Sequence, residues 1–121
     1  MALNFGISVY RNNKILHLKL SGDFDGSSAL QLIHLMHNCL EEAEQVIIHT
    51  GSISCIEPFG LNVFRYNLGS LLRHPMKFVF IGENALSLIE KWPDNSRPEL
   101  NVKQKSPYNY INRTFEEHLF F

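Results

Sequence analysis

The stretch VIIHTGSISCIEPFGLNVF, residues 46–64, indicates the fold class because it joins a short apolar run to an amphipathic one. Its first three residues are consecutive, apolar and β-branched, which is typical of a strand covered on both faces. We expect residues 50–56 to form a loop. A helix should then run from about Pro58 to Arg73, since proline suits the first helical position. A buried strand followed by a helix favours a parallel α/β fold.

The chain before this stretch predicts a hairpin. Every second residue is apolar over residues 5–9 and 16–20, and the turn-forming residues 11–14 lie between the two runs. This pattern is typical of two antiparallel strands joined by a short turn. Residues 22–26, Gly-Asp-Phe-Asp-Gly, are expected to end the second strand.

A helix is expected to follow, with Ser27 or Ser28 as its N-cap. Its apolar residues form one stripe, so the helix should lie on the sheet. They are at positions 29, 32, 33, 36, 39, 40 and 43. His34, His37 and Glu41 share the opposite face. Their spacing could hold a divalent metal, but a solvated polar face is the favoured interpretation, and no metal site is predicted.

The remainder of the chain continues the alternation of strands and helices. A buried strand is expected over residues 77–82, a short helix over 85–92 and an edge strand over 100–104. A final helix should follow Ser106 and Pro107, which repeat the cap-and-proline signal. Its inward side chains would be Tyr108, Ile111, Phe115 and Leu119.

Together these elements predict one α/β domain over residues 1–121. The core should cover about residues 5–92, with a C-terminal edge strand and helix over about 100–119. We expect a mixed, mostly parallel sheet of four to five strands, with the antiparallel hairpin at its N-terminal side. About four helices should pack against it.

The composition excludes several classes of protein. Hydrophobic residues make up 45% of the 121 residues, charged residues 19%, and the net charge is −1. This balance is that of a globular protein, and it gives no reason to expect binding to nucleic acid or to a membrane. The first residues lack a basic region followed by an apolar one, so we expect no secretion signal, and no apolar run approaches the length of about 20 residues that a membrane span needs. Cys39 and Cys55 lack metal or redox spacing, so we expect two buried thiols in a cytoplasmic protein.

Two local motifs occur within this order of elements. Residues 21–25, Ser-Gly-Asp-Phe-Asp, are similar to a Gly-x-x-Asp turn that follows a second strand. Residues 46–61 combine an apolar strand, a short loop and Gly-Leu near the start of a helix. Their order and spacing resemble the STAS domain, the fold of bacterial anti-sigma-factor antagonists and of a cytoplasmic domain in sulfate-type anion transporters. The resemblance covers about residues 5–119.

The resemblance implies a phosphorylation site that this chain has lost. In the family, the helix opens with Asp-Ser-Ser-Gly-Leu, and a partner kinase phosphorylates the first serine to switch partner binding. Here Pro58 takes that position, Phe59 takes the next, and Glu57 stands where the family has aspartate. A degenerate site at Pro58 is therefore not switched by phosphorylation. Ser52 and Ser54 are alternative phosphoacceptors, although loop serines more often only shape a turn.

The resemblance also implies a non-enzymatic regulatory domain that uses no cofactor and binds a protein partner. The partner would be an anti-sigma-factor or serine-kinase-like protein, or a subunit of a larger assembly. The expected contact residues are Asp23, Asp25, Ser27, Glu57, Pro58, Phe59, Gly60, Val63 and Tyr66. An accessory subunit of a transport or signalling assembly is the alternative. Aromatic residues at the C-terminus, Phe115, Phe120 and Phe121, also suggest a homodimer.

Phe59, Val63 and Tyr66 follow one another at helical spacing on a second apolar stripe. The core stripe of the same helix is formed by Leu61, Phe64, Leu68, Leu71 and Leu72. A helix that lies on a sheet does not need a second stripe. Two interpretations stay open. The stripe docks a partner, or Phe59 folds back over the loop and Tyr66 rests against a neighbouring helix.

A catalytic or ligand-binding function is the remaining alternative. His49 follows a buried strand, at the edge where α/β sheets often bind ligands, and could form an acid/base pair with Asp23 or Asp25. The domain would then be a small hydrolase, a metal-dependent enzyme or metal-binding domain, or a small-ligand sensor that uses His49 and Asp23. No nucleophile motif or glycine-rich phosphate loop accompanies these residues, so a hydrogen-bonded structural histidine is favoured.

Overall fold

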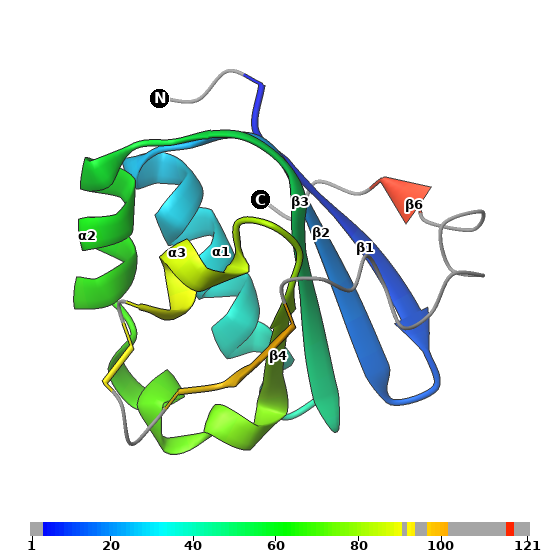
Figure 1. The fold of residues 1–121 in the computed structure, drawn as a ribbon. Helices are drawn as coiled ribbons and strands as arrows, with labels where there is room; N and C mark the ends of the chain where they lie inside the picture. Colours follow the sequence, from blue (N-terminus) through cyan, green and yellow to red (C-terminus); the bar gives the residue numbers. More distant parts are fainter. Residues whose placement is uncertain (1–3, 91, 94–96, 102–115, 118–121) are drawn as a thin grey trace.

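A mixed β-sheet forms the centre of the computed structural model, which describes residues 4–90, 92–93, 97–101 and 116–117. Within these residues the sheet has six strands in the order β5-β4-β3-β2-β1-β6. The strands are β1 (Gly6–Asn12), β2 (Ile15–Phe24), β3 (Gln45–Ile56), β4 (Phe78–Ile81), β5 (Glu99–Asn101) and β6 (Glu116–Glu117). The described α-helices lie on the same side of this sheet (Figure 1). They are α1 (Gly26–Cys39), α2 (Pro58–Tyr66) and α3 (Ala85–Ile89).

The strand pairing follows the expected pattern. β1 and β2 form the predicted antiparallel hairpin, in which Ile7 pairs with Leu20. Asn13, in the turn, has a φ of 58°, in the left-handed region that asparagine adopts more readily than most residues. β3 lies parallel to β2 and to β4, and β4 lies parallel to β5. The α/β class and the mixed, mostly parallel sheet are therefore confirmed.

Aromatic rings form the centre of the core between the sheet and the helices. Phe64 of α2 is fully buried. Its ring centroid lies 6.2 Å from that of Phe24, 6.5 Å from that of Phe80 and 5.8 Å from that of Trp92. All three pairs are edge-to-face, an arrangement that aromatic rings prefer. Phe64 therefore anchors α2 to the sheet and leaves the far side of this helix to solvent.

Two strands are longer than expected. β2 continues to Phe24 because Gly22 adopts a φ of 91° inside the strand, where a Cβ would collide with the backbone carbonyl of Asn4. β3 continues to Ile56, so the loop expected over residues 50–56 is wrong. Its glycine and serines indicated a loop, but the backbone pairs with the extended end of β2, and this tertiary pairing overrides local preference.

The second long helix is shorter than expected. α2 ends at Tyr66, and a 3-10 segment, η1 (Gly69–Arg73), replaces the predicted last turns. Asn67 closes the helix, because its Nδ2 donates a hydrogen bond to the carbonyl of Val63 at 2.7 Å. Gly69 then adopts a φ of 49°. Asn67 and Gly69 are helix-ending signals, and the prediction of one helix to Arg73 overlooked them. A second 3-10 segment, η2 (Pro75–Lys77), leads into β4.

Only part of the C-terminal prediction falls within the described residues. β5 is the predicted edge strand, parallel to β4. Glu116 and Glu117 pair with the outer edge of β1 as β6, so the helix expected there is wrong at these two residues. The other positions of that helix lie outside the described residues. They include Tyr108, Ile111, Phe115 and Leu119, and the suggested dimer contacts Phe120 and Phe121 lie outside as well.

The two cysteines differ in exposure. Cys39, the last residue of α1, is buried in the core, as expected. Cys55 is exposed, contrary to the prediction, because it lies on the part of β3 that extends past β4 and has a neighbouring described strand on one side only. In the part of the chain that the structure describes, no helix is long and apolar enough to cross a membrane.

Candidate functional site

The starts of α1 and α2 lie side by side at one end of the molecule. The backbone N–H of Glu57, which precedes α2, donates to the carbonyl of Phe24 at 3.0 Å. A Cβ at Gly60 would lie 2.8 Å from that same carbonyl oxygen and 2.9 Å from the carbonyl oxygen of Asp25. Only glycine therefore permits this close approach between the first turn of α2 and the chain that enters α1.

Asp25 is the N-cap of α1, so the expectation that Ser27 or Ser28 caps this helix is wrong. One carboxylate oxygen, Oδ1, accepts hydrogen bonds from the backbone N–H of Ser28 at 3.0 Å and from the hydroxyls of Ser27 at 2.8 Å and Ser28 at 3.0 Å. The backbone hydrogen bond from Ser28 is the main reason why the pKa of Asp25 is lowered to about 2. The two serines support the cap instead of forming it.

An apolar patch covers the junction of the two helices. Phe59 is 68% exposed and Tyr66 is 81% exposed on α2, with half-buried Val63 between them. The Phe59 ring lies over Gly26 of α1, where a Cβ would be 3.0 Å from its Cε2 atom. Leu30, one turn further along α1, is 50% exposed. We call Leu30, Phe59, Val63 and Tyr66 the helix-start patch.

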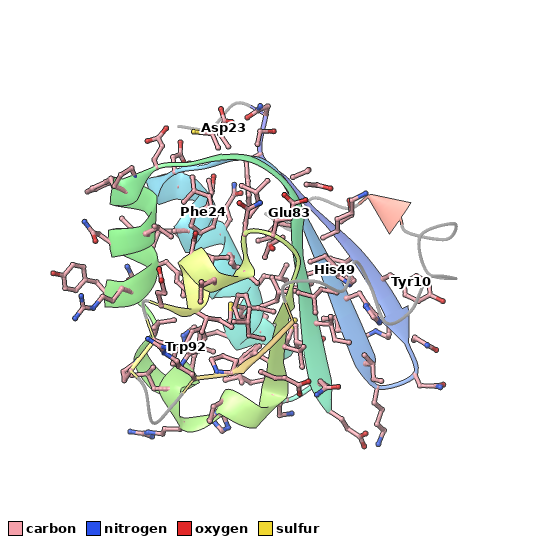
Figure 2. All side chains as sticks on the ribbon, viewed as in Figure 1. Tyr10, Asp23, Phe24, His49, Glu83 and Trp92 are labelled. Carbon is pink, nitrogen blue, oxygen red and sulfur yellow. The ribbon has the colours of Figure 1, made fainter. Side chains whose placement is uncertain are left out.

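The residues expected to bind a partner lie near the end of β2, at the start of α1 and along α2, although not all of them face solvent. Glu57, Pro58, Phe59 and Tyr66 are exposed, Asp23, Ser27 and Val63 are half-buried, and Asp25 and Gly60 are buried. Asp23 lies near the end of the sheet from which β3 leads into α2 (Figure 2). Pro58 stands at the first helical position and offers no hydroxyl. Ser52 and Ser54 are exposed on β3.

A pair of buried histidines lies on the opposite face of the sheet. His17 of β2 and His49 of β3 approach each other with 3.0 Å between Nδ1 of His17 and Nε2 of His49. Tyr10 of β1 stacks edge-to-face against His17 at 6.0 Å between ring centroids. Tyr10 and His49 both lie on the strands, away from the helices (Figure 2). The sequence pointed to His49 but not to His17. The signal for His17 was its position between Leu16 and Leu18, which places its side chain on the face of β2 opposite to the leucines.

Burial lowers the pKa of both histidines to about 4. The pKa of His49 is lowered further by the positive charges of His17 and Lys19. At neutral pH the pair is therefore uncharged, and one ring N–H donates to the other ring nitrogen. The side chain of His49 thus forms its hydrogen bond with His17. Asp23, the expected acid/base partner, lies further along the sheet, where its backbone is in register with Cys55 of β3.

The other candidate ligands do not converge in the described residues. His34 is exposed, His37 is half-buried, and Glu41 lies beyond the end of α1. Among the described side chains, no three of histidine, cysteine, aspartate or glutamate come together in a way that could hold a metal ion.

A pocket of about 310 Å³ opens between the second half of α1 and the β1–β2 hairpin. Its lining residues are Val9, Arg11, Leu16, Leu35, Asn38, Cys39 and Glu42. Arg11 and Glu42 form an exposed ion pair with 3.3 Å between Nη2 and Oε1. Burial is the main cause that raises the pKa of the Cys39 thiol to about 11, so this thiol is protonated and unreactive at neutral pH.

Comparison of the sequence with protein-family models and with curated proteins finds no match. The structure, in contrast, is similar to solved structures of one fold. An uncharacterised protein from Shewanella loihica PV-4 with a SpoIIAA-like fold has a TM-score of 0.55 and 16% identity, and the match covers 93% of this chain and 98% of that one.

The anti-sigma-factor antagonist SpoIIAA in its unphosphorylated form has a TM-score of 0.53 and 10% identity, over 91% of this chain and 96% of that one. A variant of Moorella thermoacetica RsbS with glutamate in place of a serine has a TM-score of 0.55 and 17% identity, over 89% and 96%. The chain therefore has the SpoIIAA-like fold of STAS domains.

Proposed function

We propose that this protein is a non-enzymatic regulatory domain of the anti-sigma-factor-antagonist type, which acts by binding a protein partner through the helix-start patch. The fold shared with SpoIIAA and RsbS supports a STAS-type regulatory role. The partner would be an anti-sigma-factor or serine-kinase-like protein, or a subunit of a larger assembly. The domain would act in the cytoplasm, a reducing compartment in which the exposed thiol of Cys55 persists.

The exposure of Phe59 is the observation that carries this proposal. A phenylalanine that is 68% exposed beside Leu30 and Tyr66 places a large apolar area in water at the surface of a folded domain. Phe64, one helical turn and one residue later, already supplies the buried contact of α2 with the core. The exposed area of Phe59 is therefore not needed to hold α2 on the core, and a partner that buried Phe59 would gain the apolar contact that typically dominates an interface.

The start of α2 supports binding without a phosphorylation switch. A helix N-terminus tolerates an added phosphate because its backbone N–H groups are free to bind it. Pro58 has no hydroxyl to accept a phosphoryl group and no N–H to stabilise one. We therefore propose that the domain binds its partner constitutively, or that its partner is controlled at another point.

The proposal is tested by titration calorimetry with purified candidates, namely the kinase-like and assembly proteins encoded beside its gene. Phe59→Ala should weaken binding by at least about tenfold, since exposed aromatic anchors commonly contribute this much. Leu86→Ala is the matched control, because Leu86 is 44% exposed on α3, outside the patch. Both variants should melt at nearly the wild-type temperature, and incubation with the kinase and ATP should leave the intact mass unchanged.

Three results would contradict the proposal. Unchanged affinity in both Phe59→Ala and Tyr66→Ala would remove the patch from the interface. A large loss of stability in these variants would make the patch part of the core. A phosphate adduct within residues 50–60 would show that Ser52 or Ser54 restores the switch.

A further inference from the structure

β3 extends well past the neighbouring strand β4. β4 pairs with β3 only over residues 46–49, whereas β2 pairs with β3 as far as Ile56. The turn after β4 covers residues 50 and 51 of β3. Asn84 Nδ2 donates a hydrogen bond to the carbonyl of Thr50 at 2.9 Å, and Gly82 packs against Gly51. Beyond this turn, no described strand pairs with residues 52–56 on the side away from β2. Figure 1 shows this part of β3 as a long arc that leads into α2.

We call residues 52–56 the open edge. Ser52, Ser54 and Cys55 are exposed, so solvent reaches this stretch. Natural proteins usually protect an unpaired edge with lysine, proline or inward-pointing charges. The open edge, Ser-Ile-Ser-Cys-Ile, contains none of these. The pairing with β2 is irregular near residues 50–51 and at Ser54, and such irregularities bend a strand.

Carboxylates stand at both ends of the open edge. Glu57 follows it directly, and Glu83 lies beside its start in the turn that holds Asn84 against Thr50. Figure 2 places Glu83 next to β3 toward the same end of the sheet as Asp23. Residues 50–60 and 82–90 contain no lysine or arginine, although the whole chain has 11 of them. Carboxylates therefore flank the open edge and these two segments add no positive charge to it, while the net charge of the chain is only −1.

We propose that the open edge of β3 takes up an extended, basic segment of the protein partner as an added strand. Backbone hydrogen bonds would supply part of the affinity, as in other cases of β-strand addition. The span from Gly51 to Glu57 is about 20 Å, at about 3.3 Å per residue. The segment should therefore carry basic residues about six positions apart, with small or β-branched residues between them. Since Glu83 and Glu57 stand at the two ends of the open edge, a segment with a basic residue at each end could bind parallel or antiparallel to β3.

A second copy of this chain is a poorer occupant. Two open edges brought together would place the Glu57 and Glu83 side chains of both copies within a few ångströms, and like charges at an interface are unfavourable. The inference rests on the proposed function in that the occupant is a protein. It concerns a different surface, because Phe59 packs over Gly26 of α1, whereas the open edge is the side of β3 away from β2, beyond the end of β4.

The test is an NMR titration of the isotopically labelled protein with the peptide acetyl-Arg-Thr-Val-Thr-Val-Thr-Arg-amide. The amide signals of residues 52–56 should shift most, and these amides should become protected from hydrogen exchange. The same peptide with glutamate at both ends should bind at least about tenfold more weakly, because attraction at each end is replaced by repulsion. Two further peptides carry N-methyl groups at the odd or at the even positions. Alternate N–H groups of a strand point to opposite sides, so only one of these peptides loses the N–H groups that face β3, and only that peptide should lose binding.

Charge reversal on the protein provides the second arm. The double variant Glu57→Lys/Glu83→Lys should bind the arginine peptide at least about tenfold more weakly than the wild type. The variant Glu41→Lys/Glu44→Lys has the same net charge, changes exposed residues that precede β3 at the end opposite to the open edge, and should bind the peptide like the wild type. Phe59→Ala should also leave peptide binding unchanged. It therefore separates this surface from the helix-start patch.

Several outcomes would overturn the inference while leaving the proposed function intact. They are the absence of shifts in residues 52–56, equal binding of both N-methylated peptides, and equal binding by the two charge-reversal variants. A dimer in which these amides are already protected without peptide would assign the edge to self-association. If Phe59→Ala loses binding of the partner but still binds the arginine peptide, the result would support both the helix-start patch and the open edge as separate binding surfaces.

Discussion

At the scale of single residues, the contact between His17 and His49 has the clearest physical consequence. Both rings are buried, and they share one hydrogen bond across two neighbouring parallel strands. An imidazolium in this place would lose its hydration, and this burial is the main reason why the pKa of both rings is lowered. Burial therefore favours the neutral form of the pair.

This pair predicts that mild acid destabilises the protein. Each folded-state pKa is lowered to about 4, from an ordinary value of 6.5, so the unfolded chain binds protons that the folded protein cannot bind. The stability is fully present above pH 6.5 and is lost as the pH falls toward 4. Urea unfolding at pH 7.0 and pH 4.5 should show a loss of about 2 kcal/mol or more.

The variant His49→Gln should show a smaller loss over the same pH interval, because one of the two protonation sites is removed. His34→Gln is the control, since His34 is exposed on α1. Asp25 does not interfere, because its pKa is lowered to about 2 and the stability that it provides is lost only below pH 4. An equal pH dependence in the wild type and in His49→Gln would contradict this account.

At the scale of elements, the arrangement of α1 against α2 depends on a glycine contact. The first turn of α2 crosses the chain that enters α1 at Gly60, and Phe59 is held over Gly26. β3 leads into this crossing through Glu57, whose N–H bonds to Phe24 at the end of β2. Two strand ends and two helix starts are thus joined at one point, which determines where the helix-start patch lies.

We predict that Gly60→Ala destabilises the protein by about 2 kcal/mol, because the new Cβ would lie 2.8 Å from the carbonyl oxygen of Phe24 and the backbone would have to shift. Gly51→Ala is the matched control, since a Cβ there has no neighbour within 4 Å. Its free energy of unfolding should change by less than about 0.5 kcal/mol. Equal stability of the two variants in urea unfolding would show that the helix starts are not in tight contact.

At the scale of the whole molecule, the sheet separates two environments. The helices cover one face and enclose the aromatic core around Phe64 and Trp92. The other face carries a smaller apolar cluster of Ile47, Val79 and Ile81, and the histidine pair. The open edge leads directly into α2, which carries Phe59, Val63 and Tyr66 of the helix-start patch. A partner large enough to reach both surfaces would combine an apolar anchor with an added strand.

Much of this architecture could be predicted from the sequence. Alternating apolar residues predicted the β1–β2 hairpin, and the apolar run at Val46 predicted a buried parallel strand. The ends of the elements were less accurate. Gly22 and Gly51 look like strand breakers, yet both lie inside strands, because pairing between β2 and β3 supplies backbone hydrogen bonds that a local pattern does not reveal. The end of α2 was missed at Asn67 for a different reason, since a local signal was present and was given too little weight.

The sequence by itself determined the features that depend on residue identity and spacing. These are the order of strands and helices from β1 to β5, the absence of a hydroxyl at Pro58, and the second apolar stripe of Phe59, Val63 and Tyr66. Only the tertiary structure decided which side chains and backbone edges meet. The contact of His17 with His49 joins residues 32 positions apart, and the open edge exists because β4 ends before β3 does. Both depend on strand register and strand length, which arise from contacts between distant segments and leave no periodic signal in the sequence.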